Sequence, residues 1–166
     1  EAVTRHDLIA FLTSVAENVG PDSRFIHMGM TSSDVVDTAL AIQIRGSIDL
    51  LLQSLARLRR VVRRRAFEFR RTPTIGRTHG IHAEPTTFGL KLALWYAELG
   101  RHEKRIAQAR ETINYGKISG AVGTFAHVPP SLEQQVCRTL GLRPAPISTQ
   151  ILQRDRHAEV LAALAL

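Results

Sequence analysis

Cysteine is scarce in this sequence: the 166 residues include one, Cys137. A disulfide within the chain is therefore excluded, and a structural zinc site built on cysteines is not expected. No stretch reaches the roughly 18 consecutive apolar residues of a membrane-spanning helix. The first residues, EAVTRHDLIAFL, place no basic leader before an apolar run, so no secretory signal is expected. These absences favour a protein of the reducing cytoplasm.

Proline is absent between positions 22 and 72, and in this interval the sequence predicts one very long helix. TSSD at 31–34 supplies hydroxyl caps and an acidic first turn, which suits the positive end of a helix dipole. Apolar residues then recur every three or four positions, close to a coiled-coil pattern: Val36, Leu40, Ile44, Ile48, Leu51, Leu55, Leu58 and Val62. A helix of about 38 residues, over 32–70, measures about 57 Å at about 1.5 Å per residue. Such a rod needs neighbouring helices along its length.

Four shorter helices are expected around the long one. Thr4 and Asp7 resemble a capping box at the start of the first, which Gly20-Pro21 ends. Pro85 suits the first position of another helix. The four are expected over residues 8–19, 85–113, 131–140 and from about 149 onward.

The segments between the helices, above all 72–84 and 116–130, combine glycines with flanking prolines, so we expect loops there. No strand pattern of convincing length occurs. The fold class is therefore all-α, with long helices in a bundle.

Acidic residues are in the minority: 22 Lys and Arg outnumber 15 Asp and Glu, for a formal net charge of +7. This balance suits an anionic partner, which could be nucleic acid, an acidic membrane or a phosphorylated or carboxylated metabolite. Residues 57–71 hold eight arginines and one acid. The run could bind phosphates, as a basic region does on nucleic acid. Apolar residues at core spacing within it, such as Leu58 and Val62, instead favour a solvated or subunit-paired helix face.

Polar side chains gather where helices are expected to begin. They are Thr31, Ser32, Ser33, Thr78, His79, His82, Thr86, Thr87, Ser148, Thr149 and Gln150, together with Arg5, His6 and His27. Helix N-termini offer unpaired N–H groups and a partial positive charge, which bind carboxylates and phosphates. His79 and His82 could instead ligate a metal, but only Glu84 accompanies them and no HExxH motif exists, so no metal site is expected.

The abundance of imidazoles suggests proton transfer, because this group titrates near neutral pH. An elimination needs a base for a carbon-bound proton and an acid for the leaving group. It also needs donors for a substrate carboxylate on which negative charge builds. The chain supplies acids and donors of these kinds but no obvious base.

Several segments resemble adenylosuccinate lyases, a family of the fumarase/aspartase superfamily. They are TRHDLIAF (4–11), HMGMTSSDVVDTAL (27–40), GRTHGIHAEPTTFGLKL (76–92), GKISGAVGTF (116–125) and TQILQRDRH (149–157). The TSSD and GRTHG segments are typical of the whole superfamily, whereas TRHD and HAEPTTFGLK are typical of adenylosuccinate lyases. The resemblance extends over essentially the whole chain.

The resemblance implies a β-elimination that releases fumarate from adenylosuccinate, giving AMP, and from the succinylocarboxamide ribotide of purine synthesis. It implies no cofactor and no metal, and neither nucleic acid nor a membrane as partner. It also implies a homotetramer with a central bundle of long helices and active sites built from three subunits. Residues 1–30 would then end an N-terminal helical region, and residues 31–166 would form part of the central bundle domain.

Individual residues acquire roles from the same resemblance. His79 matches the general acid that protonates the departing nitrogen. The residues that match substrate-binding positions are Arg5, His6, Asp7, His27, Thr31, Ser32, Thr78 and Gln150. His6 would lie close to the reacting centre, and His82 receives no role beyond support.

One part of the family pattern does not occur in this sequence: the mobile loop with the serine general base, a GSSAMPxKRN-type stretch. The residues expected near the substrate phosphate are missing too. The chain ends in an apolar helical run, AEVLAALAL, without a stop signal. We therefore interpret it as a piece of a longer protein and expect little lyase activity from this polypeptide alone. The alternatives are another superfamily lyase or cycloisomerase, and a non-catalytic helical oligomerisation or nucleic-acid-binding module.

Overall fold

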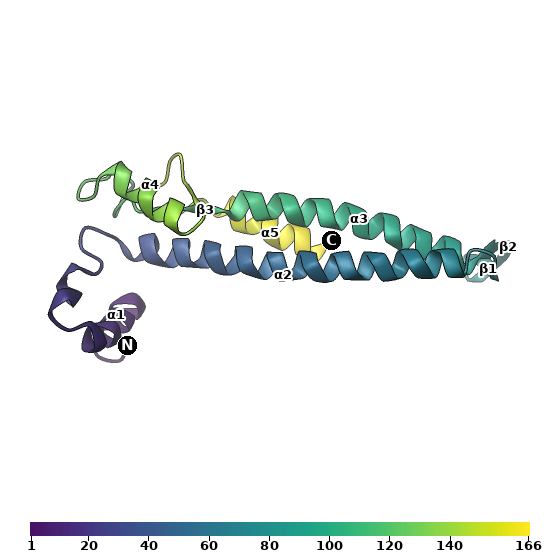
Figure 1. The fold of residues 1–166 in the computed structure, drawn as a ribbon, viewed down its shortest axis with the longest axis horizontal. Helices are drawn as coiled ribbons and strands as arrows, with labels where there is room; N and C mark the ends of the chain where they lie inside the picture. The colour runs from purple at the N-terminus through teal and green to yellow at the C-terminus, as the bar shows by residue number, and fades with distance from the viewer. The chain divides into compact units, whose positions relative to one another are not determined.

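The structure, a computed structural model, describes residues 1–166 and is mostly helical (Figure 1), which confirms the expected fold class. The elements in chain order are α1 (Asp7–Val19), the 3-10 helix η1 (Gly20–Phe25), α2 (Ser32–Glu68), β1 (Pro73–Thr78), β2 (Ile81–Thr87), α3 (Phe88–Ile113), β3 (Tyr115–Gly116), α4 (Pro130–Thr139), β4 (Arg143–Pro144) and α5 (Asp155–Ala165). None of the helices combines the length and the apolar character needed to cross a membrane.

The chain divides into two compact units, each of which is described by itself. The first unit comprises residues 1–44 and 113–155, and the second comprises residues 45–112 and 156–166. The helix α2 contributes residues 32–44 to the first unit and residues 45–68 to the second.

The second unit packs α2, α3 and α5 alongside one another (Figure 1), so the long helix has the neighbours that its length requires. Its buried apolar side chains come from all three helices: Ile48, Leu55, Leu92, Ile106, Ala109 and Val160. Arg110 of α3 donates from Nη2 to Asp49 Oδ2 of α2 at 3.1 Å. This hydrogen bond and the positive charge of Arg110 lower the pKa of Asp49, so the bridge between the two helices is charged at neutral pH.

The predicted apolar row on α2 is only partly buried. Ile48 and Leu55 are buried as expected, whereas Val36, Leu51 and Leu58 are exposed. Within the chain by itself, the neighbours that the rod needs therefore cover only part of the row. The helices α3 and α5 cover only some of the apolar residues of α2, so α2 keeps an exposed apolar surface.

Residues 73–87 form an antiparallel hairpin, so the expected loop over 72–84 is wrong. Strand β1 pairs with β2, with Thr78 opposite Ile81, and His79-Gly80 forms the turn. Both turn residues have positive φ, 52° and 77°, as a two-residue type I′ turn requires. Pro85 lies within β2 opposite Ile75, and α3 begins only at Phe88 instead of at the proline.

The first unit contains α1, η1, the start of α2, α4 and the parallel pair β3–β4. Its core includes Ala41, Cys137 and Leu142, with Ile42 packed against them. Two expected helix starts are wrong here. His6, not Thr4, caps α1, because its ring accepts the Ile9 N–H. The last helix begins at Asp155, so the segment before it, which includes Gln150, is an irregular connection.

We expect Cys137 to resist thiol reagents in the folded chain. The side chain is fully buried, and burial, aided by the negative charge of Glu133, raises its pKa to about 11 from 9.0. Such a shift lowers the thiolate fraction about 100-fold at any pH below both values. Colorimetric thiol titration at pH 8 should therefore be far slower in buffer than in denaturing urea, where one equivalent per chain reacts. Rapid labelling of the folded chain would contradict this burial.

Candidate active site

The first turn of α1 brings His6 against the first residue of α2. Nδ1 of His6 accepts the Ile9 backbone N–H at 3.5 Å and also lies 3.2 Å from Asp7 Oδ1. Nε2 lies 3.3 Å from Ser32 Oγ. Asp7 Oδ1 accepts the Leu8 N–H at 2.7 Å, and the rest of its side chain is exposed. Two residues that the sequence predicts for one site, His6 and Ser32, are thus in contact although 26 positions separate them.

The start of α2 is capped by a carboxylate. Asp34 Oδ2 accepts the Thr31 N–H at 3.0 Å, and the Asp34 N–H donates to Thr31 O at 3.0 Å. This reciprocal pair corrects the expectation that hydroxyls cap the helix, and it leaves the Ser32 hydroxyl to His6. Thr31 and Ser32 are half-buried at a helix N-terminus, where N–H groups and the helix dipole attract anions.

Backbone strain coincides with the predicted site. Four non-glycine residues have positive φ, and three of them are Arg5, His27 and His79, at 51°, 71° and 52°. A non-glycine residue in this region costs about 1–3 kcal/mol, and such residues cluster at functional sites. The fourth is Phe125, at 57°, whose N–H donates to Ser119 O at 3.0 Å.

His27 has a buried nitrogen without a partner in the chain. Its Nε2 is inaccessible and makes no hydrogen bond. A buried polar atom of this kind is normally paired, so an unpaired one needs an explanation. Because this nitrogen is inaccessible, the structure does not present Nε2 for the substrate contact predicted for His27.

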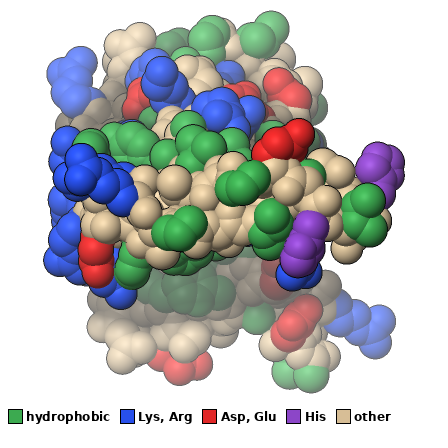
Figure 2. All heavy atoms as spheres, turned by 90° about the vertical axis from the view of Figure 1, so that its right-hand side faces the viewer, with side chains coloured by type: hydrophobic (Ala, Val, Ile, Leu, Met, Phe, Trp, Pro, Cys, Tyr) green, Lys and Arg blue, Asp and Glu red, His purple; other side chains and the backbone are tan.

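His79 occupies the tip of the hairpin and Thr78 the last position of β1, both exposed. Figure 2 views the end of the second unit that carries this hairpin, and histidine side chains project from its surface. His82 lies in β2 opposite Arg77 and is also exposed. The expectation that Thr78, His79 and His82 lie at a helix start is wrong, because a β-turn presents them instead.

The remaining predicted residues belong to the first unit. Arg5, His6, Asp7, His27, Thr31, Ser32 and Gln150 all lie there, whereas Thr78 and His79 lie in the second unit. Gln150 is exposed, and its neighbour Thr149 donates its N–H to Ile151 O at 3.3 Å in a tight turn.

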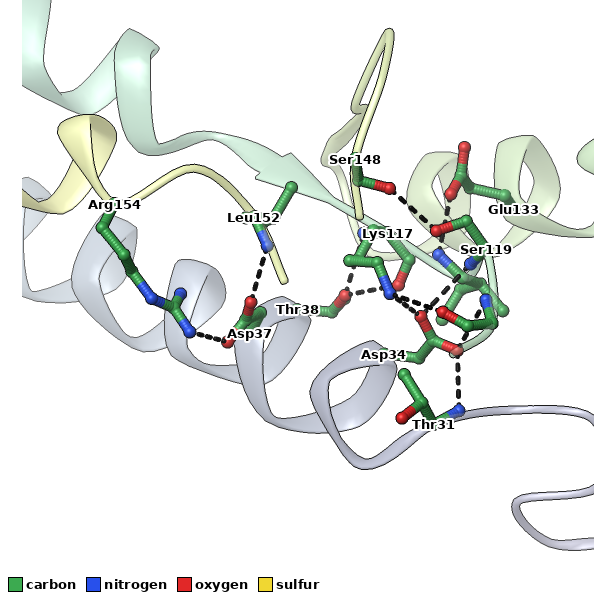
Figure 3. A network of polar contacts seen from close by, with 12 residues as sticks. Thr31, Asp34, Asp37, Thr38, Lys117, Ser119, Glu133, Ser148, Leu152 and Arg154 are labelled. Carbon is green, nitrogen blue, oxygen red and sulfur yellow. Dashed lines mark hydrogen bonds and ion pairs between the residues drawn. The ribbon is translucent and has the colours of Figure 1, made fainter. Parts of the chain in front are cut away.

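A buried polar network beside α2 was not predicted from the sequence (Figure 3). Lys117 and Asp34 form an ion pair in which both side chains are fully buried. Glu133 of α4 is also buried and accepts the Ile118 N–H at 2.8 Å. Burial raises the pKa of Glu133, and the nearby Asp34 charge acts in the same direction. The TSSD motif did contain Asp34, but its acidic residue was interpreted only as a partner of the helix dipole.

Comparison with known proteins identifies the family. A protein family described as "Lyase" matches residues 2–166. The chain belongs to this lyase family. It is 54% identical to an adenylosuccinate lyase of Bacillus subtilis (strain 168) and 52% identical to one of Aquifex aeolicus (strain VF5). Both alignments cover 100% of this chain and 38% of the relative, so the chain spans 38% of the length of these curated relatives.

Two solved structures share the fold. A fumarate lyase from Mesorhizobium sp. BNC1 is 30% identical with a TM-score of 0.91, over 99% of this chain and 39% of that one. The 3-carboxy-cis,cis-muconate lactonizing enzyme from Pseudomonas putida is 31% identical with a TM-score of 0.85, and the match covers 93% of this chain and 36% of that one. The resemblance expected from the sequence motifs is thereby confirmed at the level of the family and the fold.

Proposed function

We propose that the chain is part of an adenylosuccinate lyase, which eliminates fumarate from adenylosuccinate to give AMP. The same site would act on the succinylocarboxamide ribotide of purine synthesis. The observation that carries the proposal is identity of 52–54% to adenylosuccinate lyases along 100% of this chain. The two solved structures, which are named as other enzymes, are less similar in sequence, at 30–31% identity. The enzyme would work in the cytoplasm.

The proposed chemistry uses His79 as the general acid. Elimination breaks the bond between the substrate carbon and nitrogen, and the departing nitrogen must receive a proton. An imidazole at an exposed turn can approach a bound substrate without displacing core residues. The base that removes the carbon-bound proton would come from a loop outside this sequence.

Substrate binding would use the polar residues around the starts of α1 and α2. Thr31 and Ser32 would donate to a substrate carboxylate or phosphate, and His6 would stand beside them through its Ser32 contact. His27 would be a further contact. The other proposed contacts are Arg5, Asp7, Thr78 and Gln150.

Self-association would complete the site, in a homotetramer with active sites shared among subunits. The second unit exposes large apolar side chains on all of its helices: Leu50, Leu90, Leu94, Trp95 and Leu161, each at least 53% exposed. Apolar surface of this extent is typical of a protein–protein interface. Residues 31–166 would then belong to the central bundle of the assembly, and residues 1–30 to the preceding helical region.

The direct test adds adenylosuccinate to the full-length protein that carries this chain and follows fumarate release. Robust turnover supports the proposal. Turnover of 3-carboxy-cis,cis-muconate without turnover of adenylosuccinate would favour a related cycloisomerase. Salt-sensitive binding of duplex DNA without any lyase activity would favour a nucleic-acid-binding module, for which the arginines of residues 57–71 would be responsible. The 166-residue polypeptide alone should release little or no fumarate.

A further inference from the structure

Lys117 and Asp34 are the only ion pair in the chain whose two side chains are both inaccessible to solvent. Lysine is almost never fully buried, because its charge loses hydration. A buried ion pair can often be replaced by apolar residues of similar volume without loss of stability. Stability is therefore a weak reason for its presence, and the groups that the pair holds point to a different reason.

The Asp34 carboxylate joins two segments that are far apart in the sequence. It accepts N–H groups from Thr31 at 3.0 Å, Ser119 at 3.2 Å and Gly120 at 3.1 Å. Lys117 Nζ contacts the same carboxylate and donates to Gly120 O at 3.3 Å. One buried charge pair thus attaches the turn of residues 117–120 to the first turn of α2 (Figure 3).

A further contact extends the network from this turn to the connection that carries Gln150. Ser119 Oγ lies 2.8 Å from Ser148 Oγ. Gly123 approaches the same connection so closely that a Cβ there would lie 2.1 Å from Ser148 O. On the far side, Asp37 accepts the Leu152 N–H at 2.8 Å. Residues 148–152 are therefore held at both ends by groups fixed to α2.

We propose that the Asp34–Lys117 pair is a positioning device for substrate donors, an inference that rests on the proposed function. It fixes Thr31 and Ser32 against the connection that carries Gln150, so that these groups are arranged before the substrate arrives. Neither partner is accessible to substrate, so both are positioning residues. Preorganised donors need no rearrangement on binding, and small displacements of such groups are costly.

A charged pair suits this task better than neutral side chains would. The Asp34 carboxylate accepts hydrogen bonds from three backbone N–H groups and from the Lys117 ammonium group. These four donors occupy both carboxylate oxygens. An amide at position 34 has one acceptor oxygen, and its NH2 group would face backbone N–H donors. The pair therefore fixes one arrangement of the two segments.

The test compares Lys117→Met, Asp34→Asn and the double variant Asp34→Asn/Lys117→Met in the full-length protein. The single Lys117 variant leaves a buried carboxylate unpaired and is expected to melt at a lower temperature. The double variant carries no buried charge at these positions, so its melting temperature should recover in part. We expect its KM for adenylosuccinate to remain about 10-fold or more above wild type, with a smaller change in kcat, because pre-arranged binding is lost.

A milder variant covers the case in which the double variant does not fold. Ser119→Ala removes the hydroxyl contact to Ser148 with little change in volume, and its KM should rise several-fold at an unchanged melting temperature. Arg65→Met, which breaks an exposed ion pair with Glu68, is the control and should leave KM unchanged.

The outcomes separate this inference from the proposed function. Suppose that the wild-type protein is active. A wild-type KM in the folded double variant or in the Ser119 variant then overturns the positioning role but not the proposed function. A wild-type protein without lyase activity overturns the proposed function and this inference together. A raised KM that persists after the melting temperature has recovered supports positioning, since a purely structural role would restore both.

Discussion

Replacing His79 by asparagine should lower kcat for fumarate release by about 10²–10⁴-fold, the usual contribution of a general acid. Asparagine is the sharpest substitution because residue 79 has a φ of 52°, a conformation that asparagine tolerates better than alanine does. The turn geometry is then kept while the titrating group is lost. The measurement is steady-state fumarate release by the full-length protein, with circular dichroism and sedimentation to verify folding and assembly.

His82→Asn is the matched control for this prediction. His82 belongs to the same hairpin and is exposed as His79 is, but it lies within β2 rather than in the turn. Its replacement should change kcat only slightly. If the His79 variant kept wild-type activity, His79 would have no role in the chemistry, and His6 would be the next candidate for the acid. Equal losses in both variants would instead indicate damage to the hairpin.

The helical part of the fold was predictable because its signals are local. The interval without proline and the apolar period of α2 predict a helix over 32–70, and the observed helix is Ser32–Glu68. The hairpin was missed for a physical reason as well. Its strands have six and seven residues, contain one glycine and two prolines, and lack a buried face that would impose alternation.

The candidate site was predictable only where a motif marks it. His6, Thr31 and Ser32 stand in recognisable segments, and the structure places the first and last of these in contact. Lys117 also stands in such a segment, GKISGAVGTF, but nothing there marks it as buried, since a lysine is normally exposed and its partner Asp34 lies 83 positions away. Burial depends on the packing of the whole unit, which no local pattern reveals.

The close contact between the end of α2 and the start of α3 depends on Gly89. A Cβ at this position would lie 2.5 Å from Ala66 O and 2.6 Å from Arg70 Cα. These are backbone atoms, so no rotation of a side chain can relieve the overlap. Gly89 also donates its N–H to Phe69 O at 3.0 Å, and the Phe69 and Phe88 rings pack with centroids 5.2 Å apart.

We therefore expect Gly89→Ala to lower the free energy of unfolding by about 3 kcal/mol or more, the upper range for overpacking. Gly46→Ala is the matched control, because Gly46 lies inside α2 and no atom stands within 4 Å of its missing Cβ. That variant should be about 0.5–1 kcal/mol more stable than wild type, since alanine restricts the unfolded chain and favours helix. Urea unfolding followed by circular dichroism measures both changes.

The opposite signs make this pair of variants informative about the helix contact itself. The same methyl group is added in both, each time to a helix, so differences in helix propensity cannot account for opposite outcomes. Only the distance to neighbouring backbone distinguishes the two sites. A Gly89→Ala protein as stable as wild type would mean that α2 and α3 separate more easily at this end than their packed backbones require. The hairpin that follows α2 would then be held less firmly, and with it the turn that presents His79.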